Sequence, residues 1–127
     1  MQKFNLKQIN HLLTGVILAC EVPTQDETNR RFVTIRSFYY NHSSKNLQCW
    51  DKNIKSYQEG EHALFRIHVY TVSSESIEKE YDIYENELIE NKLTEVIGWQ
   101  EVYANLAKYV KDVNKFVPQW HCDNPLE

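Results

Sequence analysis

The chain has 127 residues and a formal charge of −4, and 42% of its residues are hydrophobic and 13% aromatic. A chain of this size and composition can bury one core, so we expect a single domain over residues 1–127. The apolar stretch from Leu12 to Cys20 is too short to span a bilayer, and it lacks the cleavage site of a secretory signal.

The first predicted elements are a short helix and a buried strand. Asn5 followed by Gln8 has the form of a capping box, and apolar residues at helical spacing predict a helix over residues 6–13. Residues 16–22 form an almost continuous apolar run that Pro23 ends, which indicates a strand.

Two further segments show the alternation of β-strands. Residues 32–40 are rich in β-branched and aromatic side chains, and a hairpin through residues 41–44 would return the chain as a strand over 46–50. Residues 63–72 alternate strictly, which predicts a strand with one apolar and one more polar face.

The segment Ser73–Asn91 is ambiguous between helix and strand. Its serines and glutamates favour a helix, and a strand paired back onto residues 63–72 is the alternative. An apolar stripe at helical spacing then predicts a long amphipathic C-terminal helix ended by Pro118. The stripe consists of Trp99, Val102, Tyr103, Leu106, Val110, Val113 and Val117.

These elements together predict an α+β fold. We expect an antiparallel meander of about four strands, with a short N-terminal helix and the long C-terminal helix. The order of the first strands is loosely like that of an OB-fold, so a partial barrel of that kind is included in the expectation.

No arrangement of residues indicates catalysis or a bound metal. Five histidines are present, but His68 and His121, the latter beside Cys122, lack the partners that an acid–base pair or a zinc site requires. We therefore expect no enzyme, no cofactor and no metal. Three cysteines without a CxxC pair suit a reducing compartment, so we expect a cytoplasmic protein.

Charge is distributed unevenly along the chain. Residues 1–74 carry six acidic and nine basic residues, whereas residues 75–127 carry twelve acidic and five basic ones. Most of the acid lies between Glu75 and Glu101, a segment that also holds aromatic residues of the kinds common in interfaces. A surface of this kind attracts basic partners and repels nucleic acid.

Our leading hypothesis is therefore a small acidic protein-binding module. It would dock on a basic partner protein and inhibit or neutralise it, as an immunity protein or a phage-encoded inhibitor does. The residues expected to bind the partner are Glu78, Glu80, Tyr81, Asp82, Tyr84, Glu85, Glu87 and Trp99.

The alternative hypothesis is an OB-like protein that binds single-stranded nucleic acid. Basic and aromatic residues alternate along the predicted strands, where they could stack bases and contact phosphates. The residues expected to do so are Arg31, Arg36, Trp50 and Arg66. An enzyme of another type and a structural subunit of a homo-oligomer are weaker options.

Overall fold

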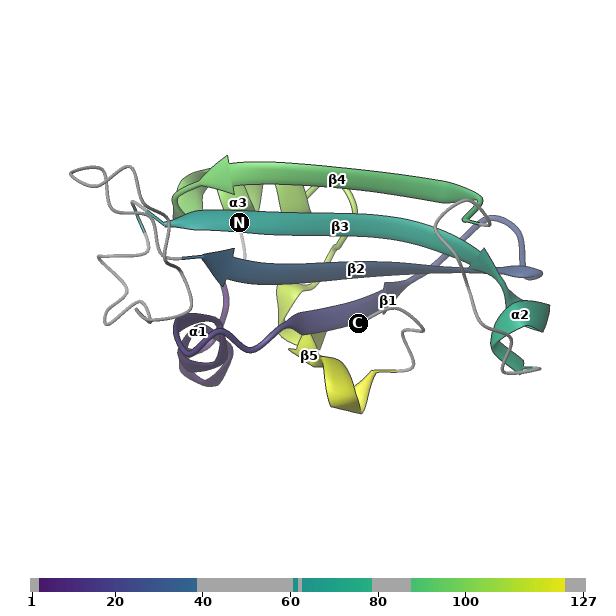
Figure 1. The fold of residues 1–127 in the computed structure, drawn as a ribbon, viewed down its shortest axis with the longest axis horizontal. Coiled ribbons are helices and arrows are strands. Elements are labelled where there is room, and N and C mark those ends of the chain that lie inside the picture. Colours follow the sequence, from purple (N-terminus) through teal and green to yellow (C-terminus); the bar gives the residue numbers. More distant parts are fainter. Residues whose placement is uncertain (1–2, 39–60, 62, 79–87, 123–127) are drawn as a thin grey trace.

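A computed structural model describes residues 3–38, 61, 63–78 and 88–122. The described part contains a five-stranded antiparallel sheet, in the order β4-β3-β2-β1-β5, and three α-helices (Figure 1). The strands are β1 (Leu18–Val22), β2 (Asn29–Phe38), β3 (Leu64–Ser73), β4 (Glu90–Ile97) and β5 (Val117–Pro118). The helices are α1 (Leu6–Leu13), α2 (Ser74–Glu78) and α3 (Trp99–Leu106), and single 3₁₀ turns cover Val113–Lys115 and Gln119–His121.

The long central strands β2 and β3 set the register of the sheet. They pair over ten residues, from Asn29 opposite Ser73 to Phe38 opposite Leu64. The alternation predicted for residues 63–72 is confirmed, because Phe65, Ile67 and Val69 are all buried on one face. We call this face the inner face and the opposite one the outer face.

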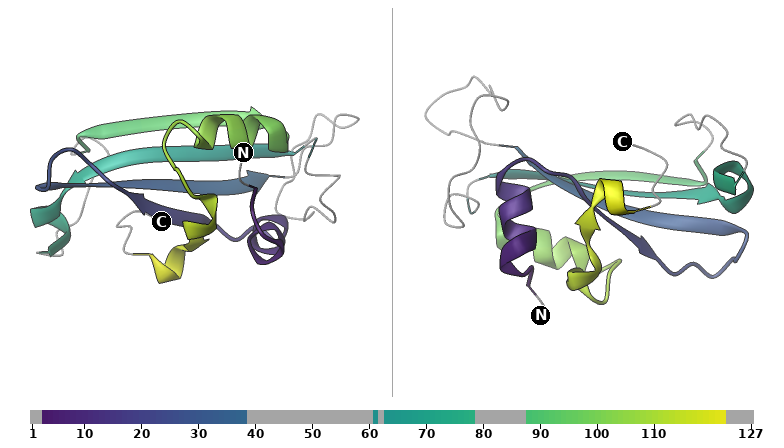
Figure 2. Two further views of the ribbon diagram at one scale, coloured as in Figure 1. Left: turned by 180° about the vertical axis from the view of Figure 1, so that it is seen from behind. Right: turned by 90° about the horizontal axis from the view of Figure 1, so that it is seen from below.

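The main core lies between the inner face and the elements packed on it. Figure 2 shows α1 and α3 against this one face of the sheet. Apolar residues from both helices, from the strands and from residues 110–116 form one buried cluster. On the outer face, Phe32, Tyr70 and Val72 form a smaller cluster, against which Ile77 of α2 and Leu88 pack.

The predicted N-terminal helix and its capping box are confirmed. Asn5 Oδ1 accepts from the backbone of Gln8, and Gln8 Oε1 accepts from the backbone of Asn5, each at 2.9 Å. Gln8 also reaches across the core, where its Nε2 donates to the carbonyl oxygens of Val113 (2.8 Å) and Phe116 (2.9 Å). This one buried side chain therefore attaches the C-terminal segment to α1.

The prediction of one long C-terminal helix is wrong. The helix α3 ends at Leu106, although Val110 and Val113 further along the apolar stripe are buried as the stripe requires. Beyond α3, Asp112 accepts from the backbone of Asn114 and starts a separate 3₁₀ turn. Val117 then pairs with Ala19 of β1, so bonds to distant parts of the chain replace the helical ones.

The expectation for residues 73–91 also needs correction. The helix α2 spans only five residues, residues 79–87 lie outside the described part, and β4 follows from Glu90 to Ile97. This strand pairs antiparallel with β3 as the alternative proposed, but only its first two residues, Glu90 and Asn91, belong to the ambiguous segment, whose beginning is helical as expected. The predicted hairpin strand over residues 46–50 lies outside the described residues.

An OB-like partial barrel is not the architecture of the described residues. Their strands form an open sheet, with β4 at one edge and the two-residue β5 at the other. Closure into a barrel would require the two edge strands to pair with each other. The α+β class itself is compatible with the structure.

Replacing Gln8 tests the link between α1 and the C-terminal segment. We expect Gln8→Ala to lower the free energy of unfolding by about 2 to 3 kcal/mol, because two buried carbonyl groups lose their donor. Urea denaturation measures the change, with Lys7→Ala on the exposed side of α1 as the control that stays near wild type. Equal stability of the two variants would show that Gln8 has no such role.

The two glycines with positive φ form a matched pair. Gly98 (φ +89°) joins β4 to α3, and a Cβ atom there would lie 2.9 Å from the backbone oxygen of Glu61. Gly15 (φ +87°) has open space at the same position. We expect Gly98→Ala to destabilise the fold by at least about 1 kcal/mol more than Gly15→Ala, since only the first adds overlap to backbone strain. Thermal and urea unfolding of both variants measure this difference, and equal losses would contradict it.

Candidate functional site

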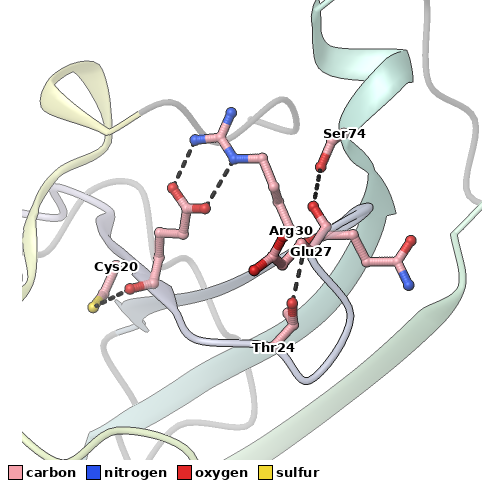
Figure 3. Close-up of polar contacts among 7 residues, drawn as sticks. Cys20, Thr24, Glu27, Arg30 and Ser74 are labelled. Atoms are coloured by element: carbon pink, nitrogen blue, oxygen red, sulfur yellow. Dashed lines mark hydrogen bonds and ion pairs between the residues drawn. The ribbon is translucent and has the colours of Figure 1, made fainter.

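The turn between β1 and β2 is hydrogen-bonded to the start of α2. Ser74 N donates to the carbonyl oxygen of Thr28 at 2.7 Å. Ser74 Oγ donates to the carbonyl oxygen of Glu27 at 3.3 Å (Figure 3). These contacts exist because β2 and β3 are antiparallel, so the beginning of β2 lies beside the end of β3. Two segments far apart in the sequence thus form one end of the molecule.

The turn is itself ordered by short polar contacts. The carboxylate of Asp26 accepts from Thr28 N at 2.9 Å and from Thr28 Oγ1 at 2.7 Å. Both bonds favour the charged form, and the side-chain bond, followed by the backbone bond, lowers the pKa of Asp26 below its ordinary value. Thr24 Oγ1 donates to the backbone carbonyl of Asp26 at 2.7 Å. The turn therefore presents Asp26 as a fixed anion.

Three acidic residues whose side chains the structure describes share this end of the sheet, which we call the acidic end. They are Asp26 and Glu27 from the turn and Glu75 from α2. Asp26, Glu27 and Glu75 are exposed. Like charges that converge from separate segments produce a stronger negative potential than either segment would alone.

The two arginines at the start of β2 are bound to acidic residues outside this group. Arg30 binds the carboxylate of Glu21 through two contacts of 2.6 and 2.8 Å (Figure 3). Arg31 binds Glu90 of β4 through contacts of 2.8 and 3.0 Å, and its guanidinium lies over the Tyr109 ring. Each of these two-contact ion pairs uses a carboxylate that does not belong to the acidic end.

Only part of the predicted partner-binding set can be placed. Glu78 is the last residue of α2. Trp99 requires a correction, because it is 4% exposed and packs on Phe65 at a ring distance of 4.7 Å, so it is a core residue and no surface anchor. The remaining residues of the set lie outside the described part of the chain; they are Glu80, Tyr81, Asp82, Tyr84, Glu85 and Glu87.

The residues predicted to bind nucleic acid do not form one surface. Arg36 and Arg66 lie directly opposite each other on the outer face, but Arg31 belongs to the inner face. Arg66 also binds Glu95 of β4 at 3.2 Å. Trp50 lies outside the described residues. The described strands therefore do not present a row of cationic side chains along one face.

The histidines and cysteines that the structure describes serve local contacts. His68 Nε2 lies 2.6 Å from Asn91 Oδ1, and His121 is exposed beside Trp120. Burial, with a smaller contribution from Cys122, raises the pKa of Cys20 to about 11, so this core thiol is a poor nucleophile. Among the described residues, no three His, Cys, Asp or Glu side chains come together in a way that could hold a metal ion.

Sequence reasoning missed Asp26 and Glu27. The signal was available, because any antiparallel pairing of β2 with β3 places the turn before β2 next to the residues that follow β3. The negative charge that this turn adds to the acidic end is recognised only when charges are grouped by the end of the sheet at which they lie, and not by stretches of sequence.

Comparison with known proteins gives no relatives: no family model, curated protein or solved structure matches the chain. Within the described residues, no helix has the length and apolar character needed to cross a membrane.

Removing the hydroxyl of Thr28 tests the ordering of the turn. We expect Thr28→Ala to raise the pKa of Asp26 toward its ordinary value, because the bond from the Thr28 hydroxyl, which lowers this pKa most, is lost. Since the folded-state pKa of Asp26 is lowered, these bonds stabilise the fold above the unfolded-state pKa, and this contribution disappears as the pH falls through the folded-state value. NMR titration of the Asp26 carboxyl measures the shift.

Thr24→Ala is the matched control, because Thr24 contacts the backbone of Asp26 and not its carboxylate. An Asp26 pKa that responds equally to both substitutions would show that the fold of the turn as a whole, and not the Thr28 hydroxyl, sets this pKa.

Proposed function

We propose that this protein is a small protein-binding module that docks its acidic end on a basic partner protein and thereby inhibits or neutralises that partner. The observation that carries the proposal is the attachment of the β1–β2 turn to α2 through Ser74. It brings Asp26 and Glu27 of the turn beside Glu75 of α2.

Electrostatics support a role in fast and selective association. Negative side chains gathered at one end of a molecule raise the encounter rate with a basic surface and disfavour acidic competitors. The turn is fixed by its own hydrogen bonds and by α2, so little conformational entropy is lost when its charges meet a partner. A preorganised anionic surface of this kind suits an inhibitor that must find its target quickly.

A protein partner agrees better with this geometry than a nucleic acid does. Phosphate backbones are repelled by the acidic end, and three arginines of the sheet, Arg30, Arg31 and Arg66, bind carboxylates of the same chain. We also propose that the module acts in the cytoplasm, where its odd number of cysteines would stay reduced. The absence of an enzymatic activity remains a prediction.

Charge reversal at the acidic end tests the proposal. The tagged full chain is first used at low salt to isolate its partner from cells of the source organism, and association is then followed by stopped-flow or surface plasmon resonance. We expect Glu27→Lys combined with Glu75→Lys to slow association by about tenfold or more at low salt, and to weaken its salt dependence, because steering is lost.

The matched control is Glu101→Lys in the first turn of α3, where an exposed glutamate belongs to a different part of the fold. We expect this variant to associate within about twofold of the wild-type rate. An acidic partner, or equal rates for all three proteins, would overturn the proposed function.

A further inference from the structure

The strand β4 forms an edge of the sheet. It pairs with β3 on one side, and in the described part of the chain no strand lies on its other side (Figure 1). On its outer face, Leu93 is 55% exposed and Ile97 is 46% exposed, and Ile89 just before the strand is 60% exposed. An unpaired strand edge with exposed apolar side chains is a surface on which another strand can add.

The backbone of β4 presents regularly spaced bonding groups along this edge. Gly98 N donates to the carbonyl of Ala63 at 3.1 Å, in the same register as the β3–β4 pairs. Because antiparallel ladders alternate, even-numbered residues of β4 direct their N–H and C=O groups toward β3, and odd-numbered ones direct them outward. The outward groups therefore belong to Asn91, Leu93, Glu95 and Ile97, the same residues whose side chains lie on the outer face.

The sequence of β4 matches itself when two copies pair antiparallel about a two-fold axis at Leu93. Leu93 then faces Leu93 of the second copy, and Asn91 faces Glu95. On the inner face, Lys92 faces Thr94 and Glu90 faces Val96. The two exposed Leu93 side chains therefore meet at the axis, and no like charges stand opposite each other within β4.

The neighbouring registers fit less well. An axis at Lys92 places two lysines face to face, and an axis at Glu95 does the same with two glutamates. An axis at Thr94 sets Leu93 against Glu95. Of these four registers, the Leu93 register alone avoids both like-charge repulsion and the pairing of an exposed apolar side chain with a charged one.

Polar contacts on the outer face prepare the Leu93 register. Asn91 Oδ1 lies 2.6 Å from His68 Nε2, which leaves the amide hydrogens of Asn91 directed elsewhere. Glu95 is held by Arg66 at 3.2 Å, and one of its oxygens can accept a further hydrogen bond. In the paired strands the Asn91 amide of each copy faces the Glu95 carboxylate of the other copy. The two-fold axis therefore produces this donor–acceptor contact twice.

The antiparallel arrangement also keeps the acidic ends apart. Each β4 begins near the acidic end of its own copy, since Glu90 pairs with Thr71 near the start of α2. Two antiparallel strands place these ends at opposite extremes of the joined sheet, whereas a parallel pair would set them side by side. Charge therefore favours the two-fold arrangement.

We propose that a second copy of this chain binds the outer edge of β4, so that two five-stranded sheets join into one about a two-fold axis at Leu93. One strand edge and a few apolar side chains make a small interface, and we expect a dissociation constant on the order of micromolar. This dimerisation surface is separate from the acidic end and does not depend on the proposed function.

Sedimentation velocity of the full chain from about 1 to about 100 micromolar tests the proposal. We expect wild type to shift from monomer to dimer over this range and Leu93→Lys to stay monomeric, because two lysines would meet at the axis. Leu6→Lys makes the same chemical change at an exposed position of α1, and this control should dimerise like wild type. Circular dichroism verifies that all three proteins are folded.

Disulfide trapping tests the register and does not depend on Leu93→Lys being folded. Opposite residues in such a pair have Cα atoms about 5.5 Å apart, within reach of a disulfide. We expect a mixture of Asn91→Cys and Glu95→Cys chains to cross-link to each other on mild oxidation, with neither variant linking to itself. Wild type gives the background of the native cysteines, and peptide mass spectrometry identifies the linked positions.

Three results would overturn the proposal. They are a wild type that stays monomeric across the whole range, a Leu93→Lys variant that is folded and dimerises like wild type, and a mixed sample whose 91–95 cross-link does not exceed the background.

Discussion

The pairing of β2 with β3 over ten residues is the constraint on which the other parts of the described structure depend. Its register turns Val33, Ile35, Phe65 and Ile67 to one side, which gives α1 and α3 an apolar surface to cover. The same register brings the turn before β2 next to α2 and aligns Arg31 with Glu90 across β3. A shift by one residue would exchange the inner and outer faces, so the core and the acidic end arise from one alignment.

Ion pairs across the sheet explain how a chain with such an uneven charge distribution can fold compactly. The mildly basic first half supplies Arg30, Arg31 and Arg66, and each binds a glutamate on another strand of the sheet. Partly exposed pairs of this kind contribute little to stability individually. Their effect is on where charge is neutralised, because each pair uses a glutamate of a strand and none uses Asp26, Glu27 or Glu75.

The sequence allowed good prediction wherever local signals and tertiary packing agreed. The capping box of Asn5 and Gln8 predicted α1, and strict alternation predicted β3 and its two faces, because both signals come from residues close together in the chain. The apolar stripe beyond Leu106 correctly predicted buried residues but not a helix, since the carbonyls of Val113 and Phe116 are satisfied by Gln8, more than a hundred residues away. No local pattern contains that information.

The candidate site was only partly predictable for the same reason. The acidity of α2 is visible in the sequence, whereas the contribution of Asp26 and Glu27 depends on which strand ends lie together. Trp99 has the composition of an interface anchor, but the turn at Gly98 directs it into the core. Residue type alone does not distinguish a buried tryptophan from an exposed one.

The two edges of the sheet differ in a way that limits how far strands can add to one another. At β4 the edge offers eight residues, whereas β5 has only two, and one of them, Pro118, has no N–H group to donate. A chain with two open edges can polymerise without end into fibrils. Here the second edge is blunt, so association through β4 would stop at a closed pair, and the protein could remain dispersed at high concentration.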